Sequence, residues 1–268
     1  MKRIHWSVIG PMVAAMAGGT AARAVDPAPV TFEQRVFASK ANAGESLPYV
    51  VAKPADWDAK KTYPLLVFLH GAGERGDDNQ AQLKWGREWM EKAVREFHAV
   101  VVAPQCPPDA RWVEADWSQK TTAMPKEPSR PMRLLFELLG GVEKEFSVDP
   151  ARRYVAGLSM GGYGTWDALC RRPGYFAAGV PICGGGDENQ AKAIVKIPVW
   201  VFHGAKDSVV PVVRARNMVA ALKKAGGTPK YTEYPDVDHF SWVPAFAEPD
   251  LLKWLFAQKR NIPATAPK

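Results

Sequence analysis

Short apolar segments alternate with longer amphipathic segments along most of the chain. The short segments are nearly continuous apolar runs, which is typical of parallel strands that are covered on both faces. The longer segments place their apolar residues at helical spacing. This alternation predicts an α/β domain, in which helices cover both faces of one twisted, mostly parallel, eight-stranded sheet.

The predicted elements can be placed along the sequence. The central parallel strands are expected at residues 65–70, 99–103, 153–157, 178–182 and 199–203. Additional strands should lie at the edges of the sheet, with antiparallel ones at residues 31–38 and 49–52 and a last one at residues 230–234. Helices are expected at residues 79–97, 130–146, 160–172, 212–225 and 249–259.

Residues 104–131 differ from the rest of the chain because they show no periodicity. The segment contains six prolines, two tryptophans and mixed charges. Such a composition predicts a long loop, and its position after an expected strand places it over the carboxyl edge of the sheet. Long loops at that edge are often functional.

The composition is that of an ordinary globular domain, with 268 residues of which 47% are hydrophobic and 24% are charged. These values exclude a disordered, collagen-like or coiled-coil chain. The formal net charge is +7, of which Lys2, Arg3 and Arg23 supply three, so that +4 remains beyond residue 24. Because these remaining charges are scattered, we expect no nucleic-acid partner.

The amino terminus has the pattern of an export signal. Lys2 and Arg3 precede an uncharged stretch over residues 4–17, and small residues follow up to Ala24. We therefore expect a signal peptide at residues 1–24 and one catalytic domain at residues 25–268, exported to the periplasm or secreted. An uncleaved anchor is the alternative, but the apolar run is short and interrupted by Pro11, so no stable membrane partner is expected. The oligomeric state stays open.

The motif with the clearest chemical meaning is G-x-S-x-G at residues 157–161. It lies between an expected strand and an expected helix, which is the setting of a nucleophile elbow. The sharp turn needs small neighbours on both sides and raises the serine hydroxyl above the sheet. We therefore predict that Ser159 is a nucleophile, the alternative being a passive serine in a glycine-rich turn.

A serine nucleophile needs a histidine base and an acid, which follow it in that fold in the order serine, acid, histidine. His239 lies in the expected loop before the last helix, whereas His203 ends a strand and would reverse the order. Asp207 follows the strand at residues 199–203 and is the preferred acid. The competing acids are Asp187, Asp236 and Asp238.

The loop after the strand at residues 65–70 offers backbone amides for an oxyanion. We expect the amides of Ala72 and Met160 to form the oxyanion hole, because Gly71 and Gly73 let the backbone approach a substrate closely. Residues 71–76 also match G-x-G-x-x-G, but no helix is expected to open directly after them, so nucleotide binding is disfavoured.

The tryptophans offer flat apolar surfaces for aromatic or sugar groups. The side chains expected to contact a substrate are those of Trp85, Trp112 and Trp242, together with the backbone at Gly71. Ordinary packing is the alternative for each tryptophan. No metal-ligand spacing is present, and serine chemistry needs no cofactor, so we expect neither a metal nor a cofactor.

Four segments, at residues 70–76, 103–107, 157–164 and 203–211, resemble the α/β-hydrolase superfamily. Within it, the chain resembles secreted carboxylesterases often labelled predicted peptidases, which are similar to feruloyl and acetyl xylan esterases and to the catalytic domain of prolyl oligopeptidases. The resemblance covers residues 45–257. It implies the α/β-hydrolase fold and the same site residues as above. The chain departs from the family's pattern at Asp238, because a glycine often precedes the histidine in such enzymes.

In the sheet order that this resemblance implies, Cys106 and Cys183 end strands three positions apart, roughly 14 Å at about 4.8 Å per strand. That distance exceeds the limit of about 7 Å between Cα atoms in a disulfide, so we expect unpaired cysteines.

Taken together, the sequence predicts a serine carboxylesterase that acts through an acyl-enzyme on an aryl or carbohydrate ester of feruloyl or acetyl type. A serine peptidase and a dienelactone-type lactone hydrolase are alternatives on the same residues. A non-enzymatic carbohydrate-binding relative is the alternative outside catalysis.

Overall fold

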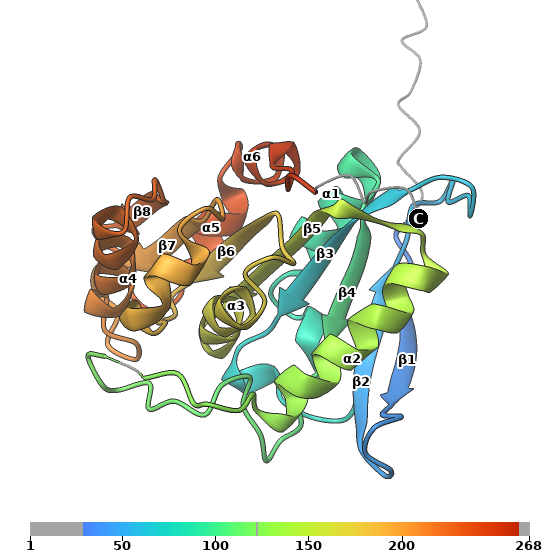
Figure 1. The fold of residues 1–268 in the computed structure, drawn as a ribbon, viewed down its shortest axis with the longest axis horizontal. Coiled ribbons are helices and arrows are strands. Elements are labelled where there is room, and N and C mark those ends of the chain that lie inside the picture. The colour runs from blue at the N-terminus through green and yellow to red at the C-terminus, as the bar shows by residue number, and fades with distance from the viewer. Residues whose placement is uncertain (1–28, 122, 263–268) are drawn as a thin grey trace, which may run out of the picture.

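The computed structural model describes residues 29–121 and 123–262. One mixed sheet runs through the molecule in the order β1-β2-β4-β3-β5-β6-β7-β8 (Figure 1). β2 pairs antiparallel with both β1 and β4, and the other pairs are parallel. The strands are β1 (Glu33–Ala38), β2 (Ser46–Ala52), β3 (Tyr63–Leu69), β4 (Val100–Pro104), β5 (Val148–Leu158), β6 (Ala178–Ile182), β7 (Trp200–Gly204) and β8 (Lys230–Tyr234). The predicted eight-stranded sheet with one antiparallel edge is confirmed.

Helices cover both faces of the sheet, as the near-continuously apolar strands require. The helices are α1 (Arg87–Phe97), α2 (Arg130–Glu145), α3 (Met160–Arg171), α4 (Val213–Lys224), α5 (Trp242–Ala247) and α6 (Leu251–Ala257). α2, α3 and α4 share one apolar core with the sheet, and α1, α5 and α6 share a second core on the opposite face (Figure 1). Among the described residues, no helix is long and apolar enough to cross a membrane.

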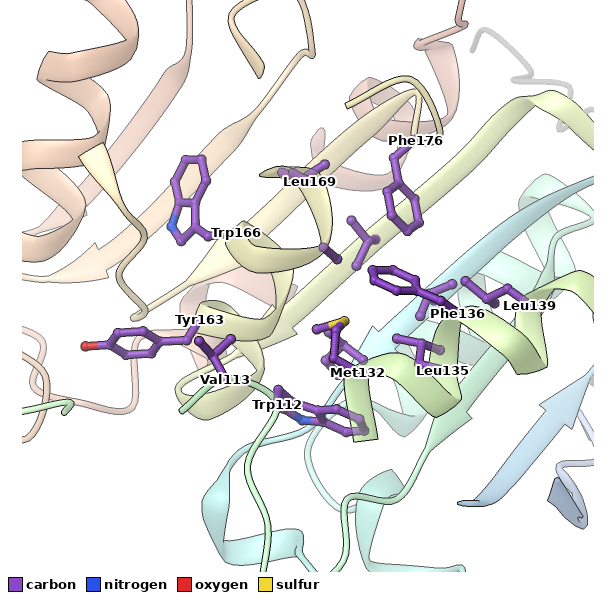
Figure 2. Close-up of a cluster of buried hydrophobic side chains, with 14 of the residues drawn as sticks. Trp112, Val113, Met132, Leu135, Phe136, Leu139, Tyr163, Trp166, Leu169 and Phe176 are labelled. Carbon is purple, nitrogen blue, oxygen red and sulfur yellow. The ribbon is translucent and has the colours of Figure 1, made fainter. Parts of the chain in front are cut away.

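The first of these cores joins α2 and α3 to the loop that connects β4 to α2. Figure 2 shows Met132 and Leu135 of α2, Trp166 and Leu169 of α3, and Trp112 of the loop within one buried cluster. Each large apolar side chain that is removed from water contributes roughly 1.5–3 kcal/mol to folding before entropy costs. Burial of Trp112 therefore fixes part of this loop to the helices beneath it.

The predicted long loop is present. Between the end of β4 and the start of α2, the described residues form no helix or strand; residues 105–129 are called the long loop below. The predicted signal peptide lies outside the described residues.

We predicted a helix at residues 79–97, but the observed helix begins later in the chain. A 3₁₀ turn, η2 (Ala81–Leu83), precedes α1, which begins only at Arg87. Asn79 has a φ of 54°, which a helix does not allow, and its amide donates to the side chain of Gln105. A local tertiary hydrogen bond therefore replaces the first helical turns.

Two further elements depart from the sequence pattern. α5 was not expected, because Pro244 and the short length of the helix obscure its periodicity; proline is tolerated there since it lies in the first turn. β5 begins at Val148 rather than at residue 153 and so includes Pro150. The pairing of β5 with β3 shifts register between Tyr63 and Leu65, which accommodates that irregular start. Another 3₁₀ turn, η3 (Glu188–Ile194), follows β6.

Candidate active site

Ser159 lies at the sharp turn between β5 and α3, as the motif predicts. Its φ of 52° and ψ of −117° are unusual for a residue with a side chain, at a cost of about 1–3 kcal/mol. The Ser159 amide donates to the carbonyl oxygen of Ile182 at 2.9 Å, which holds the turn against β6. The backbone thus fixes the serine at the carboxyl edge of the sheet.

The glycines on either side of Ser159 are required by close backbone contacts. A Cβ atom on Gly161 would lie 1.9 Å from the carbonyl oxygen of Leu69, and one on Gly157 would lie 2.3 Å from that of Gly161. Neither backbone group can move away without disturbing β3 or α3. The turn can therefore approach β3 only because these two positions carry no side chain.

His239 joins the serine to an acid. Its Nε2 lies 2.9 Å from the Ser159 Oγ, and its Nδ1 lies 2.8 Å from the Asp207 Oδ2. An ionised carboxylate only accepts hydrogen bonds, so Nδ1 carries the proton and Nε2 is free to accept from the serine hydroxyl. The structure therefore brings together the serine, histidine and acid that the sequence selected.

Asp207 is held as an ionised carboxylate at the start of the β7–α4 connection. The amides of Val209 and Val210 donate to its Oδ1 at 2.9 and 2.8 Å. Burial opposes ionisation, but the hydrogen bonds from His203, His239 and Val210 outweigh it and hold the pKa of the carboxyl well below its usual range. The negative charge needed beside an imidazolium is thus present at any ordinary pH.

His203, at the end of β7, contacts the same carboxylate and was missed as a site residue. Its Nε2 lies 3.2 Å from the Asp207 Oδ2 and 3.0 Å from the carbonyl oxygen of Val210. Both neighbours accept hydrogen bonds, so Nε2 carries the proton. The sequence signal was the spacing of four residues between His203 and Asp207, which we interpreted only as the end of a strand.

The competing acids have other partners. Asp187 accepts from the amides of Asn189 and Met124, and so joins η3 to the long loop. Asp236 forms an exposed ion pair with Lys206. Asp238 accepts from the amide of Phe240. Asp207 is therefore the acid that contacts His239, as predicted.

The predicted oxyanion donors lie at two turns beside the serine. Met160 is the first residue of α3, so its amide has no acceptor within the helix. Ala72 begins the 3₁₀ turn η1 (Ala72–Glu74). A Cβ atom on Gly71 would lie 3.6 Å from the Ser159 Cβ, which shows that this loop abuts the nucleophile turn. The oxyanion role of both amides stays a prediction.

His70, at the end of β3, positions this loop. Its Nε2 accepts from the Cys106 amide at 2.9 Å, so the proton lies on Nδ1, which donates to the carbonyl oxygen of Gly71 at 2.7 Å. Burial lowers the pKa of His70 to about 4, so the imidazole is neutral. The G-x-G-x-x-G match at residues 71–76 contains η1 and does not open into an α-helix, since α1 begins only at Arg87, which departs from the geometry of a dinucleotide site.

The prediction that Trp112 lines the substrate site is wrong. Its side chain is 0% exposed, and its Nε1 donates to the carbonyl oxygen of His70. Trp242 is 5% exposed and packs edge-on against the His239 ring, with 5.4 Å between centroids, so it supports the base and offers little open surface. Trp85 is half-buried and lies beside Trp242. Phe240, which we did not single out, is 47% exposed next to these rings.

Gly71 is buried rather than open to a ligand. A Cβ atom there would meet the side chains of Leu158 and Glu74 at 2.8 and 3.1 Å. The glycine therefore allows close packing inside the protein. Contact between its backbone and a substrate stays a prediction.

The three cysteines are buried and unpaired, as predicted. Ligand atoms of Cys183, Asp207 and His239 lie within 4.8 Å of one another. Burial raises the pKa of the Cys183 thiol and so favours its protonated form. Asp207 and His239 already bind each other.

Comparisons with known proteins show that this chain is similar to esterases. The sequence model of the family named Esterase, described as "Putative esterase", matches residues 41–182. A "Bifunctional acetylxylan esterase/xylanase XynS20E" of Neocallimastix patriciarum is 23% identical over 190 residues, which are 68% of this chain and 26% of that protein. A "Probable feruloyl esterase C" of Aspergillus terreus is 24% identical over 168 residues, 61% of this chain and 56% of that protein.

The fold is also that of solved esterases. The crystal structure of a thermostable esterase superposes with a TM-score of 0.76 at 38% identity, over 85% of this chain and 63% of that one. A feruloyl esterase module of Clostridium thermocellum, complexed with sinapinate, superposes with a TM-score of 0.62 at 15% identity, over 87% of this chain and 90% of that one. The predicted α/β-hydrolase fold is confirmed. The chain spans about a quarter of the bifunctional relative and under two thirds of the thermostable esterase.

Proposed function

The chain belongs to the Esterase family, and we propose that it is a serine carboxylic-ester hydrolase with Ser159 as nucleophile, His239 as base and Asp207 as acid. One observation carries the proposal: a single imidazole lies within hydrogen-bond distance of both the Ser159 hydroxyl and a buried carboxylate. A serine in a strained turn with these partners is the arrangement that acyl transfer requires.

The reaction follows from this geometry. Ser159 Oγ attacks the ester carbonyl carbon while its proton moves to His239 Nε2. The imidazolium, stabilised by Asp207, then protonates the leaving alcohol, and an acyl-enzyme remains. Water gives a proton to His239 Nε2 and attacks the acyl carbon. As the bond to Ser159 Oγ breaks, His239 returns that proton to the serine and the carboxylic acid leaves. The amides of Ala72 and Met160 stabilise the oxyanion in both steps, with an effect of about 10²–10³-fold per donor.

The substrate is an aryl or carbohydrate ester. Support comes from the relatives named as acetylxylan and feruloyl esterases. Trp85 and the exposed Phe240 lie in T-shaped contact, at 5.8 Å between ring centroids, beside the loop of His239. Aromatic faces of this kind suit the packing of aryl rings and sugars.

The protein is exported. Support comes from the signal-like residues 1–24 and from a relative named "Uncharacterized secreted protein" of Arthroderma benhamiae, 25% identical over 228 residues. Amino-terminal sequencing of the protein from the culture medium and the periplasm tests this part, and we expect the chain to begin at Val25.

Mass spectrometry after reaction with a fluorophosphonate tests the chemistry, alongside turnover of 4-nitrophenyl and methyl hydroxycinnamate esters and of matched anilides. We expect an adduct on Ser159, ester turnover and little anilide turnover. The absence of both an adduct and ester turnover would contradict the proposed esterase. Faster cleavage of the anilides than of the esters would indicate a peptidase.

A further inference from the structure

A buried carboxylate beside the site has no place in the reaction described above. Glu74 ends η1, the turn that begins with Ala72, and its residue is only 5% exposed. Burial raises the pKa of the Glu74 carboxyl, and the Trp85 indole N–H and the charge of Lys84 oppose that rise. Burying a carboxylate is costly, so its persistence next to a candidate oxyanion site calls for a role.

The two oxygens of Glu74 face two different loops. Oε2 lies against Gly71, where a Cβ atom would come within 3.1 Å of it. Oε1 accepts from the Trp85 Nε1 at 3.0 Å. The carboxylate therefore folds back beneath its own loop and binds the indole that follows η2.

The Trp85 indole continues this connection to the loop that carries the base. Its ring lies 5.7 Å from the Trp242 ring and 5.8 Å from the Phe240 ring, between centroids. Trp242 in turn packs against the His239 imidazole at 5.4 Å. Glu74, Trp85 and Trp242 thus form a continuous contact between the loop of residues 71–74 and the loop of residues 239–242.

We propose that Glu74 is a positioning residue, which holds the loop carrying the Ala72 amide in place relative to His239 through the Trp85 indole. The inference rests on the proposed function, because it takes the Ala72 amide as an oxyanion donor. A donor displaced by about 1 Å costs on the order of 10²-fold in rate. A packing role alone would instead change how many molecules fold, without changing the rate of each active site.

The test measures kcat and KM for 4-nitrophenyl acetate. The concentration of active sites used to calculate kcat comes from titration to completion with a fluorophosphonate. Titration removes unfolded molecules from the rate. We expect Glu74→Ala to lower kcat about 100-fold with KM changed less than about threefold. Glu74→Gln keeps an oxygen that can accept from Trp85, and should recover kcat to within about fivefold of the wild type.

Trp85→Phe keeps an aromatic ring but removes the N–H donor, and should lower kcat about tenfold. The double variant Glu74→Ala/Trp85→Phe should lose no more than Glu74→Ala, because both changes break one connection. Trp89→Phe is the matched control: this nearby tryptophan is buried, and its Nε1 has no hydrogen-bond partner among the described residues. Its kcat should not change.

A kcat of Glu74→Ala within threefold of the wild type would overturn the inference, and so would losses of kcat that multiply in the double variant. The proposed function would stay intact in either case, provided that the wild type hydrolyses the ester. If Glu74→Ala does not fold, the comparison of Trp85→Phe with Trp89→Phe decides the question. A loss of kcat in Trp85→Phe alone supports the connection, and equal kcat values in the two variants refute it. A wild type without turnover would contradict the proposed function itself.

Discussion

The turns that carry Ser159 and Asp207 and the long loop at residues 105–129 lie at one edge of the sheet but are held in different ways. The turns are positioned by backbone: glycines against β3 at Ser159, and two amides on the carboxylate of Asp207. The long loop is held in part by charged side chains. Arg171 donates to three of its carbonyl oxygens, those of residues 125–127, and Asp187 accepts from one of its amides.

This difference separates the reacting groups from the long loop. A backbone-built turn cannot be altered without disturbing the sheet, so the reacting groups keep their geometry through most substitutions. A loop that depends on single side chains can be released by one substitution. Variants of the two regions should therefore fall into different classes, with loss of turnover in the turns and loss of loop order in the long loop.

The largest effect is expected for Ser159→Ala, because no other group can form the acyl-enzyme. Turnover of 4-nitrophenyl acetate should fall by about 10⁵-fold or more. The melting temperature should stay within a few degrees, since the hydroxyl supports little packing. Steady-state kinetics and a thermal melt measure both quantities, and retained turnover would refute the assignment of the nucleophile.

Asp207→Asn should lower kcat by about 10⁴-fold, because an amide cannot impose the Nδ1–H tautomer on His239 or stabilise its charge. Asp236→Asn is the control, since that exposed carboxylate pairs only with Lys206 among the interactions described above. Kinetics of the two purified variants measure the effect. A large loss in Asp236→Asn, with Asp207→Asn active, would mean that the acid is misassigned.

Asp167, which pairs with Arg171 beneath the long loop, should make stability depend on pH. Burial raises the pKa of its carboxyl from 3.8 to about 6. The folded state thus binds this proton more tightly than the unfolded state, and the contribution that is fully present below the unfolded pKa is lost as the pH rises through 6. Two pKa units correspond to about 3 kcal/mol in the free energy of unfolding.

Urea denaturation of the wild type and of Asp167→Asn from pH 4 to pH 7 measures this contribution. Subtracting the variant removes the titration of all other groups that the two proteins share. The difference should fall by about 2 kcal/mol between pH 4 and pH 6 and by a few tenths of a kcal/mol more up to pH 7. Parallel stability curves would show that Asp167 titrates normally.

The smallest effect is expected for Arg171→Met, which removes the donors to the carbonyl oxygens of residues 125–127. Trypsin should cleave after Lys120 or Lys126 about tenfold faster, because local opening becomes easier. Labelling of Ser159 should be preserved. Arg172→Met is the matched control, since Arg172 packs on the rings of Phe136 and Tyr175 instead of the loop; equal cleavage in both variants would contradict the anchoring role.

The same contrast explains what could be predicted from the sequence. The strands Ala178–Ile182 and Lys230–Tyr234 have the predicted bounds, because apolar or alternating runs report burial directly. The order of serine, acid and histidine on parallel strands placed Asp207 and His239 at one edge. These inferences rest on period and order, which the chain displays locally.

What could not be predicted depends on contacts between distant segments. Trp112 lies in a loop without periodicity, so nothing in its neighbourhood indicates that it is buried under α3. His203 has the pattern of a strand residue, and only the folded loop shows that its ring meets Asp207. The link from Glu74 to Trp85 likewise appears only once η1 and η2 have been placed.

The requirement for glycine at residues 157 and 161 also limits how the sequence of this protein can diversify. Any replacement at these positions places a carbon atom inside the van der Waals radius of a carbonyl oxygen or carbon in the neighbouring backbone. A library of random variants selected only for folding would leave both positions unchanged, whatever ester was later supplied. The same library would accept many sequences at exposed positions of residues 116–121, so inherited sequence differences can accumulate there without altering the reacting groups.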